Sequence, residues 1–230
     1  MSIQVVILAA GMGTRLARPL PKPLTELRDG RSIMQQQFDN LQSVFSDTHR
    51  VMIVVGFKLE AIIERFPEAT FVYNEFFDQT NTSKSLLKAL RASADGGVLW
   101  LNGDVVFDPQ VLARIAPFIE AEQSVVVVNT SKVSEEEVKY RLDADGYIAE
   151  LSKTVVDGLG EAVGINYVSA KDKKSLIARL SEVEDGDYFE RGIEFGIDKD
   201  GLKFKAVDIS DLYAVEVDFA EDLERANELF

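Results

Sequence analysis

The feature that most constrains this 230-residue chain is the alternation of short apolar runs with segments of helical spacing. The apolar runs occupy residues 3–9, 51–55, 98–101 and 124–128, and a shorter strand-like segment occupies 70–74. Helical spacing is found at 31–45, 58–66, 82–93 and 108–119. Runs that are apolar at both odd and even positions are typical of strands buried on both faces. The first 130 residues are therefore predicted to form a mostly parallel sheet with helices on both faces.

The rhythm changes after residue 130. Short strand-like segments at 137–142, 147–151 and 162–168 are separated by glycine-containing turn signals. Helical patterns follow at 171–183 and 188–197, then strands at 203–207 and 213–217, and a closing helix at 218–229. Repeats, low-complexity stretches and linkers are absent from the sequence. We expect a single α/β domain spanning 1–230, whose second part adds a small mixed-sheet lobe.

Composition narrows the classes of protein. Acidic residues outnumber basic ones by 39 to 25, a net charge of −14, which argues against a nucleic-acid binder. Cysteine is absent, which excludes disulfides, thiolate metal sites and a cysteine nucleophile. The start of the sequence lacks the pattern of a signal peptide, and apolar stretches are too short to span a membrane, so a cytoplasmic protein is expected. The one histidine, His49, precedes a strand and is expected to be structural.

A glycine-rich loop follows the first predicted strand, in the stretch "ILAAGMGTRLARPLPKPL" (7–24). Such loops bind anions through their backbone N–H groups. A dinucleotide fingerprint would need glycine or alanine at position 16 and an acidic residue ending the second strand, but Leu16 and Val55-Gly56-Phe57 are found there. A P-loop would need Gly-Lys-Ser/Thr, which the stretch also lacks. The loop instead offers two cations, Arg15 and Lys22, for phosphate groups.

Three segments in this order resemble the nucleotidyltransferases that activate sugar phosphates and alcohol phosphates: "LAAGMGTRL…PKPL", "LWLNGDVVF" (99–107) and "AVEVDFAEDLERA" (214–226). The resemblance implies a Rossmann-like three-layer α/β/α fold with a mostly parallel mixed sheet and a small acceptor-binding lobe. It also implies a Mg²⁺ cofactor held by Asp104 and Asp218. Independently, Asp104 ends an apolar strand and Asp218 follows another, which would place both carboxylates at the carboxyl edge of the sheet. Taken singly, each could be a turn or capping residue.

The resemblance divides the chain into a nucleotide-binding part (1–130), an acceptor-binding part (131–213) and a closing metal-binding strand and helix (214–230). Arg15 and Lys22 would stabilise the charge that develops on a departing pyrophosphate. The remaining residues implied to bind nucleotide at the loop and the metal strand are Leu8, Ala9, Ala10, Gly11, Gly13, Thr14 and Gly103. In "YNEFFDQTNTSKSLLKAL" (73–90), Asn81, Thr82, Ser83 and Ser85 are candidates for contacts with the base or ribose, although Thr82 or Ser83 could serve only as a helix cap.

The same stretch is most similar to bacterial choline-phosphate cytidylyltransferases, which implies CTP as donor and phosphocholine as acceptor. Lys153 matches a family lysine that would position the acceptor phosphate, which makes it the third catalytic candidate. The segment "GEAVGINYVS" (160–169) resembles the family's acceptor-binding strand, which makes Glu161 a candidate for acceptor binding. Residues that could bind a quaternary ammonium through aromatic faces and a carboxylate are Tyr167, Tyr188, Phe189 and Glu190. The aromatic residues could instead pack a helix against the sheet.

Alternatives remain open at this point. The acceptor could be a sugar-1-phosphate, an inositol phosphate or a glycerol phosphate. A non-catalytic nucleotide-binding module on the same fold is a second class, which retention of Asp104, Asp218, Arg15 and Lys22 disfavours. A nicotinamide oxidoreductase is a third class, disfavoured by Leu16. The sequence leaves the oligomeric state undetermined.

Overall fold

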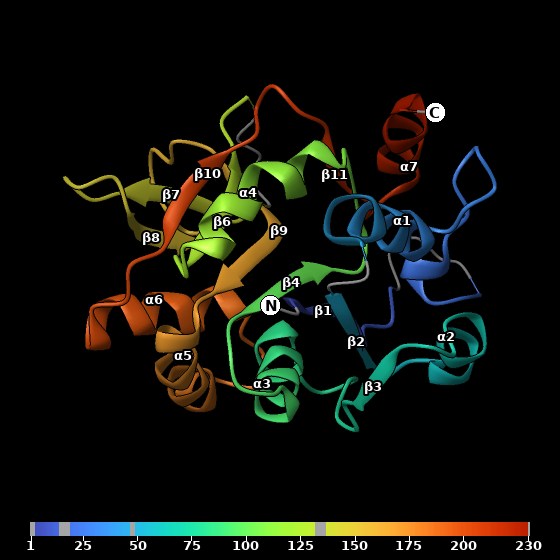
Figure 1. The fold of residues 1–230 in the computed structure, drawn as a ribbon, viewed down its shortest axis with the longest axis horizontal. Helices are drawn as coiled ribbons and strands as arrows, with labels where there is room; N and C mark the ends of the chain where they lie inside the picture. Colours follow the sequence, from blue (N-terminus) through green and yellow to red (C-terminus); the bar gives the residue numbers. More distant parts are fainter. Residues whose placement is uncertain (1–2, 14–18, 47–48, 132–136, 230) are drawn as a thin grey trace.

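The computed structural model describes residues 3–13, 19–46, 49–131 and 137–229, and in this part of the chain nine strands join one sheet. Seven of them follow the spatial order β10 (Lys205–Asp208), β6 (Val125–Asn129), β9 (Glu161–Val168), β4 (Val98–Asn102), β1 (Ile3–Ala9), β2 (His49–Val55) and β3 (Thr70–Tyr73). Along this path every pairing is parallel except those of β9, which runs antiparallel to β4 and β6. The prediction of a mostly parallel mixed sheet is confirmed (Figure 1).

Helices cover both faces of this sheet (Figure 1). One face carries α1 (Ile33–Phe45), α2 (Leu59–Arg65) and α4 (Gln110–Glu120), and the other carries α3 (Thr82–Ala92), α5 (Ala170–Glu182) and α6 (Phe189–Asp200). Strand β1 contacts both layers, because successive side chains of a strand point to opposite faces. Val5 and Ile7 pack into the first core, whereas Val6 and Leu8 pack into the second. The three-layer architecture explains why this strand is apolar along all of its length except Gln4.

The predicted lobe is an extension of the same sheet. Strands β7 (Lys139–Leu142) and β8 (Ile148–Ser152) form an antiparallel hairpin, and β7 also pairs with the beginning of β9. Helix α6 packs on this hairpin, since Phe189 and Ile193 share a core with Ile148 and Leu151. The lobe is therefore fixed to the rest of the sheet through β9.

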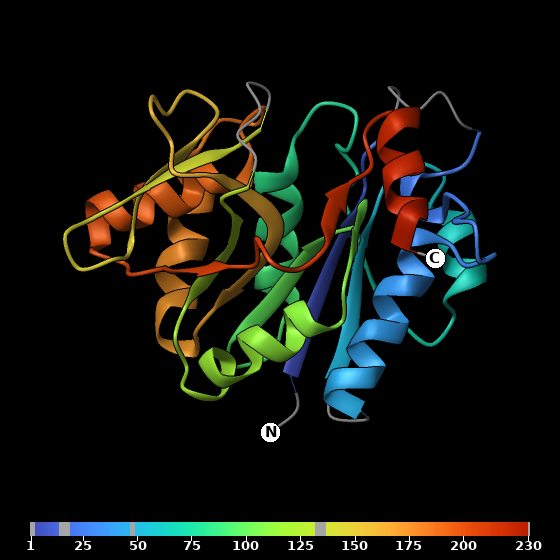
Figure 2. The same cartoon turned by 90° about the horizontal axis from the view of Figure 1, so that it is seen from above.

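The C-terminal segment returns to the centre of the molecule. Strand β11 (Ala214–Glu216) pairs antiparallel with β5 (Val105–Phe107), a short strand that the sequence patterns did not predict. Helix α7 (Ala220–Ala226) and a 3-10 turn (Asn227–Leu229) follow, and α7 lies beside the start of α1 (Figure 2). A small core of Leu27, Ile33, Val217 and Leu223 joins these segments. The pairing brings residues 104–107 and 214–218 together.

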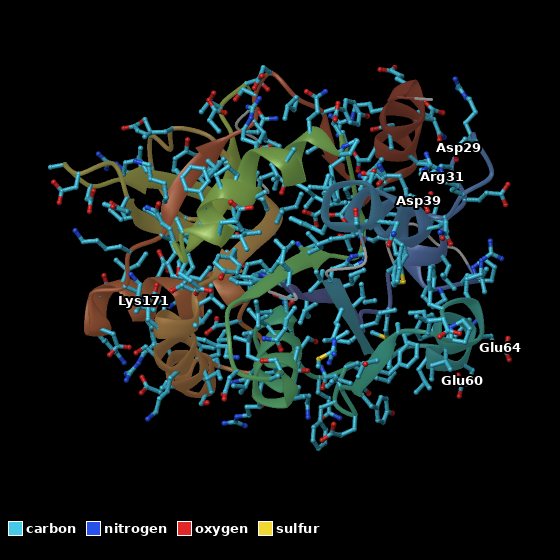
Figure 3. The ribbon with its side chains drawn as sticks, in the orientation of Figure 1. Asp29, Arg31, Asp39, Glu60, Glu64 and Lys171 are labelled. Carbon is cyan, nitrogen blue, oxygen red and sulfur yellow. The ribbon has the colours of Figure 1, made fainter. Side chains whose placement is uncertain are left out.

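The surface carries dispersed charges. On α2, Glu60 and Glu64 lie at the periphery, as does Lys171 at the start of α5 (Figure 3). Arg31 pairs with both Asp29 and Asp39 and so fixes the turn that leads into α1 (Figure 3). Among the described residues, no helix combines the length and the hydropathy needed to cross a bilayer.

Candidate active site

A cavity of about 300 Å³ opens at the carboxyl edge of the parallel strands. Leu8 of β1 and Asn102 of β4 line its floor, and the two residues are register partners in the sheet. This is the edge at which open α/β sheets bind ligands. His49 lies at the opposite edge, opposite Ile3, and takes no part in the cavity.

The tight turn between β4 and β5 carries Asp104 into the cavity. The Gly103 N–H donates to the carbonyl of Leu8 at 2.9 Å. A Cβ atom at position 103 would lie 2.8 Å from that carbonyl oxygen, so glycine is required for the turn to approach β1 this closely. The carbonyl of Asp104 accepts from Val217 N at 2.9 Å, which places the β11–α7 junction alongside. Gly103 therefore allows the turn to pack against β1, but it does not itself line the cavity.

Three carboxylates gather at this turn. Asp104, Glu216 and Asp218 each offer an oxygen atom, and these atoms lie within 4.8 Å of one another. Glu216 was missed in the sequence, although it ends β11 only two residues before Asp218. Burial raises the pKa of Glu216 well above its usual range, and the charges of Asp104, Glu137 and Asp218 raise it further.

Lys22 lies among these carboxylates, at a 3-10 turn (Lys22–Leu24) that follows the glycine loop. Its Nζ atom is 2.8 Å from Asp104 Oδ2 and also pairs with Asp218. Burial by itself would lower the pKa of Lys22, but the two aspartates outweigh burial and raise it, so the ammonium is charged at neutral pH. One ammonium among three carboxylates leaves an excess of negative charge. The donor set is made of hard oxygen atoms and fits the chemistry of a divalent cation such as Mg²⁺.

The glycine loop forms the adjoining wall. Gly11 and Gly13 line the cavity, and Ala9 lines a small hollow of about 120 Å³ between the loop and Lys22. Gly13 has φ = 56°, and a Cβ atom there would lie 3.1 Å from Lys22 Cβ. Ala10 is buried, and its carbonyl accepts from Phe57 N, so it supports the loop. The predictions for Thr14 and Arg15 fall outside the described residues.

The four candidate residues at the start of α3 do not all lie at the cavity. Asn81 is its cap, since its side-chain oxygen accepts from Thr82 N at 2.8 Å. Ser83 and Ser85 are buried outside the cavity, and the Ser85 hydroxyl accepts from Asn74 at 3.1 Å. The N-terminal amides of α3 are also used by a neighbour, because Asn81 N donates to Asp185 O and Ser83 N to Asp187 O. Of the four predicted residues, only Thr82 lines the cavity.

The far end of the cavity combines a cation, aromatic rings and carboxyl groups. Lys153, which follows β8, places its Nζ atom 4.6 Å from the centroid of the Tyr188 ring. Phe189 and Glu190 begin α6 and line the same end, and Glu137 faces them. Thr82 fixes this segment, because its hydroxyl oxygen accepts from Phe189 N at 3.1 Å.

Glu190 is the most unusual group at this end. Glu190 is 7% exposed, and within the described part of the chain its Oε2 atom has no hydrogen-bond partner. Burial raises the pKa of Glu190 to about 7, with further upward contributions from Glu194 and Glu137 and an opposing one from Lys153. A buried carboxyl oxygen without a partner is costly, and a cationic ligand would relieve the cost.

Two predicted acceptor residues lie elsewhere. Tyr167 is 2% exposed and packs in the core, with its hydroxyl close to Gly97 and hydrogen-bonded to Glu122. The reason is strand direction: β9 is antiparallel to its neighbours, so its last residues lie at the opposite edge from the cavity. Glu161, at the start of β9, lines an adjacent cavity of about 560 Å³ with Asp222 and Arg225.

A mostly parallel sheet with a glycine loop after β1 and carboxylates after β4 is the Rossmann-like fold of nucleotidyltransferases. The family model for the MobA-like NTP transferase domain matches residues 5–182, and the chain belongs to this family. The chain therefore falls in the sugar-nucleotidyltransferase-like group.

Relatives of known function match most of the chain. It is 30% identical over 250 residues to CMP-5'-(3-aminopropyl)phosphonate synthase of Streptomyces rubellomurinus, a match that covers 98% of the chain and 38% of that protein. It is 28% identical over 222 residues to bifunctional protein GlmU of Methanococcus maripaludis, covering 94% of the chain and 49% of that protein. The chain thus spans half or less of the length of these two relatives.

Solved structures share the fold. CTP:phosphocholine cytidylyltransferase from Streptococcus pneumoniae superposes with a TM-score of 0.76 at 18% identity, covering 100% of the chain and 99% of that protein. The inositol-1-phosphate CTP transferase from T. maritima superposes with a TM-score of 0.80, also at 18% identity, covering 99% and 94%. At such identities the likeness is one of fold.

Proposed function

We propose that the chain catalyses transfer of CMP from CTP to a small acceptor that carries a phosphate at one end and a cationic amine at the other, with phosphocholine as the first candidate. One observation carries the proposal: a single cavity joins the Lys22–Asp104–Glu216–Asp218 cluster to the Lys153–Tyr188–Glu190 end. The first end suits phosphate groups with a divalent cation. At the second end, Lys153 could pair with the acceptor phosphate, while Tyr188 and Glu190 suit an ammonium group.

Asp104 and Asp218, with Glu216 beside them, would hold Mg²⁺, which when bound supplies positive charge to the phosphate oxygens. The backbone at Gly11 and Gly13 and the ammonium of Lys22 border the same space and would bind the triphosphate. In the reaction an oxygen of the acceptor phosphate attacks the α-phosphorus, and the bond from that phosphorus to the pyrophosphate oxygen breaks. A phosphate monoester is largely a dianion near neutral pH, because its second pKa is about 6, so the attack needs no general base.

The cationic end supports an amine-bearing acceptor. The ring of Tyr188 already holds the ammonium of Lys153 on its face, which demonstrates that this surface accommodates a cation. The free Oε2 atom of Glu190 offers a carboxyl oxygen to the same ligand. A sugar phosphate would bring no positive charge to this end.

A second candidate acceptor is an aminoalkylphosphonate. The relative at 30% identity is named for such a product, and its name also supports CTP as the donor. A primary ammonium can donate hydrogen bonds to Glu190, whereas a quaternary ammonium relies on aromatic faces and charge alone. The two candidates therefore make different demands on Glu190 and Tyr188.

The test is a pyrophosphate-release screen in which ATP, CTP, GTP and UTP are each combined with phosphocholine, 3-aminopropylphosphonate, inositol-1-phosphate, glucose-1-phosphate and glycerol phosphate. We expect turnover with CTP and an amine-bearing acceptor. Asp104→Asn should abolish it, while Asp108→Asn, which removes only a carboxylate that accepts from Gln110 N at 2.8 Å, should leave it close to wild type. Equal turnover by wild type and Asp104→Asn would refute the assignment of the site. Turnover with sugar phosphates alone would refute the amine-bearing acceptor.

A further inference from the structure

Three amide side chains on α1 face the strand pair that carries Asp104. Gln36, Gln37 and Asn40 are 3%, 0% and 5% exposed, on a helix face that otherwise buries apolar residues such as Met34 and Leu41. Burying a polar amide is costly unless it forms hydrogen bonds. The amide nitrogen of each side chain donates to a backbone carbonyl in residues 102–107, whereas the Oε1 atoms of Gln36 and Gln37 have no hydrogen-bond partner among the described residues.

Gln37 differs from its neighbours because it spans the Asp104 turn. Its Nε2 atom donates to Asn102 O at 2.9 Å and to Val105 O at 2.8 Å. These carbonyls belong to the residues immediately before Gly103 and immediately after Asp104. One amide group therefore connects both ends of the turn, without contact between Gln37 and the cavity itself.

The other contacts of the turn come from backbone groups. Gly103 N donates to Leu8 O of β1, and Asp104 O accepts from Val217 N, both at 2.9 Å. The turn is thus held by β1, by the β11–α7 junction and by α1. The contribution of α1 to the backbone of the turn is made by a side chain, so a substitution can remove it while the backbone contacts remain.

Helix α1 is a firm support for this contact. Ser32 caps its first turn, accepting from Gln35 N at 3.1 Å. Arg31 and Gln35 both donate to Asp39, each at 2.9 Å (Figure 3 labels Arg31 and Asp39). A side chain on a fixed helix can define the orientation of a turn more closely than one on a loop.

We propose that Gln37 is a positioning residue for the metal-binding carboxylate of Asp104. Its amide holds the turn so that the carboxylate faces Glu216 and Asp218. Groups that orient a ligand's own backbone or side chain affect metal affinity by about 10- to 100-fold. The inference rests on the proposed divalent-cation site and adds a residue outside the cavity to it.

The experiment is a Mn²⁺ titration of the full chain, followed by electron paramagnetic resonance in the absence of nucleotide. Gln37→Met keeps the length of the side chain but removes both N–H donors. Gln36→Met is the matched control, because Gln36 is buried on the same helix and donates at 2.7 Å to Phe107 O, a carbonyl that Asn40 also bonds. We expect Gln37→Met to weaken Mn²⁺ binding about tenfold or more and Gln36→Met to change it by less than about twofold. In an Asp104→Asn background, Gln37→Met should produce no further loss.

Both variants are measured at a temperature well below their own unfolding midpoints. Gln37→Asn, which keeps the amide but shortens its reach, serves as a second variant and should also weaken binding. Wild-type protein that fails to bind Mn²⁺ would overturn the proposed cation site. If the wild type binds Mn²⁺ and Gln37→Met binds it with the same affinity, the role of Gln37 is overturned and the cation site stands. The same holds if Gln36→Met loses as much Mn²⁺ affinity as Gln37→Met. If no Gln37 variant folds, the residue is structural and the inference is rejected.

Discussion

Replacing Lys22 by methionine removes the positive charge from the centre of the carboxylate cluster. At 2.8 Å, and with an effective dielectric constant of about 20, the attraction between Lys22 and Asp104 is about 6 kcal/mol. Much of this is offset by desolvation, and breaking such a buried pair by removing one partner costs about 3–5 kcal/mol. The Asp104 and Asp218 side chains are 20% and 23% exposed, so the lower limit applies, a loss of about 3 kcal/mol in the free energy of unfolding. For a chain of this size, that lowers the unfolding midpoint by about 6–12 °C.

The same substitution has an opposite effect on metal binding. The ammonium of Lys22 contacts oxygen atoms that a divalent cation would also use, so the two positive charges compete. Lys22→Met should therefore bind Mn²⁺ more tightly than wild type, and saturating Mg²⁺ should restore much of the lost stability. Nucleotidyl transfer should nevertheless fall by about 100-fold, because a cation next to the phosphates is lost.

Thermal unfolding in EDTA and in Mg²⁺, together with a Mn²⁺ titration, measures both effects. Lys88→Met is the matched control: its Nζ atom also lies 2.8 Å from a carboxylate, that of Glu75, but the two side chains are 29% and 48% exposed. Such an exposed pair contributes little to stability, because solvent screens the attraction. Equal destabilisation by the two substitutions, or weaker Mn²⁺ binding in Lys22→Met, would refute the reasoning.

Three further substitutions probe other parts of the site. Burial raises the pKa of Glu190 from 4.5 to about 7, so the wild type loses stability as pH rises through this interval, by at most about 3 kcal/mol. In urea unfolding, Glu190→Gln should therefore become progressively more stable than wild type between pH 5 and 8. A difference in stability that stays constant with pH would contradict this. Thr82→Val removes the hydroxyl oxygen that accepts the hydrogen bond from Phe189 N, and it should raise the KM for the phosphorylated acceptor substrate about fivefold. Thr82→Ser keeps the hydroxyl and should stay near wild type. Equal KM values for the two variants would exclude this hydrogen bond as a support for substrate binding. Gly103→Ala should lower the free energy of unfolding by more than about 2 kcal/mol, because its Cβ atom would meet the Leu8 carbonyl. Gly186→Ala, with open space around its Cβ position, should change the free energy of unfolding by less than about 0.5 kcal/mol. Similar losses of stability in calorimetry would argue against the close approach of Gly103 to Leu8.

The sheet and the two aspartates at its carboxyl edge could be predicted from the sequence, because the patterns that indicate them lie in neighbouring residues. Apolar runs marked the strands, and Asp104 and Asp218 each stand two residues after the end of one, β4 and β11 respectively. Glu216 could have been found in the same way, since it ends β11 two residues before Asp218. Strand β5 could not be distinguished as a separate strand, because Val105–Phe107 follows the apolar run of β4 after only a short turn at Gly103-Asp104.

Residues whose placement depends on strand direction or on distant contacts could not be predicted. Tyr167 looked accessible to an acceptor because the sequence of β9 does not reveal that it runs antiparallel. The start of α3 looked free to bind a base, but its amides are used by the carbonyls of Asp185 and Asp187, about a hundred residues away. A cap can be predicted from its own residue type, whereas a neighbour that competes for the same N–H groups cannot.

The charges of the cavity bear on the kind of acceptor. A sugar phosphate would place its negative end at the Lys22 cluster and a neutral end beside Glu190, whose Oε2 atom would stay buried and unpaired within the described part of the site. An acceptor with an ammonium group would pair with Glu190 and stabilise its ionised form, so the pKa of this carboxyl should fall below about 7 on binding. By linkage, the affinity for such an acceptor should then rise with pH between about 5 and 8, while a neutral-ended phosphate should show no such rise beyond its own ionisation. The pH dependence of acceptor binding thus distinguishes the two classes of substrate, even where both are turned over.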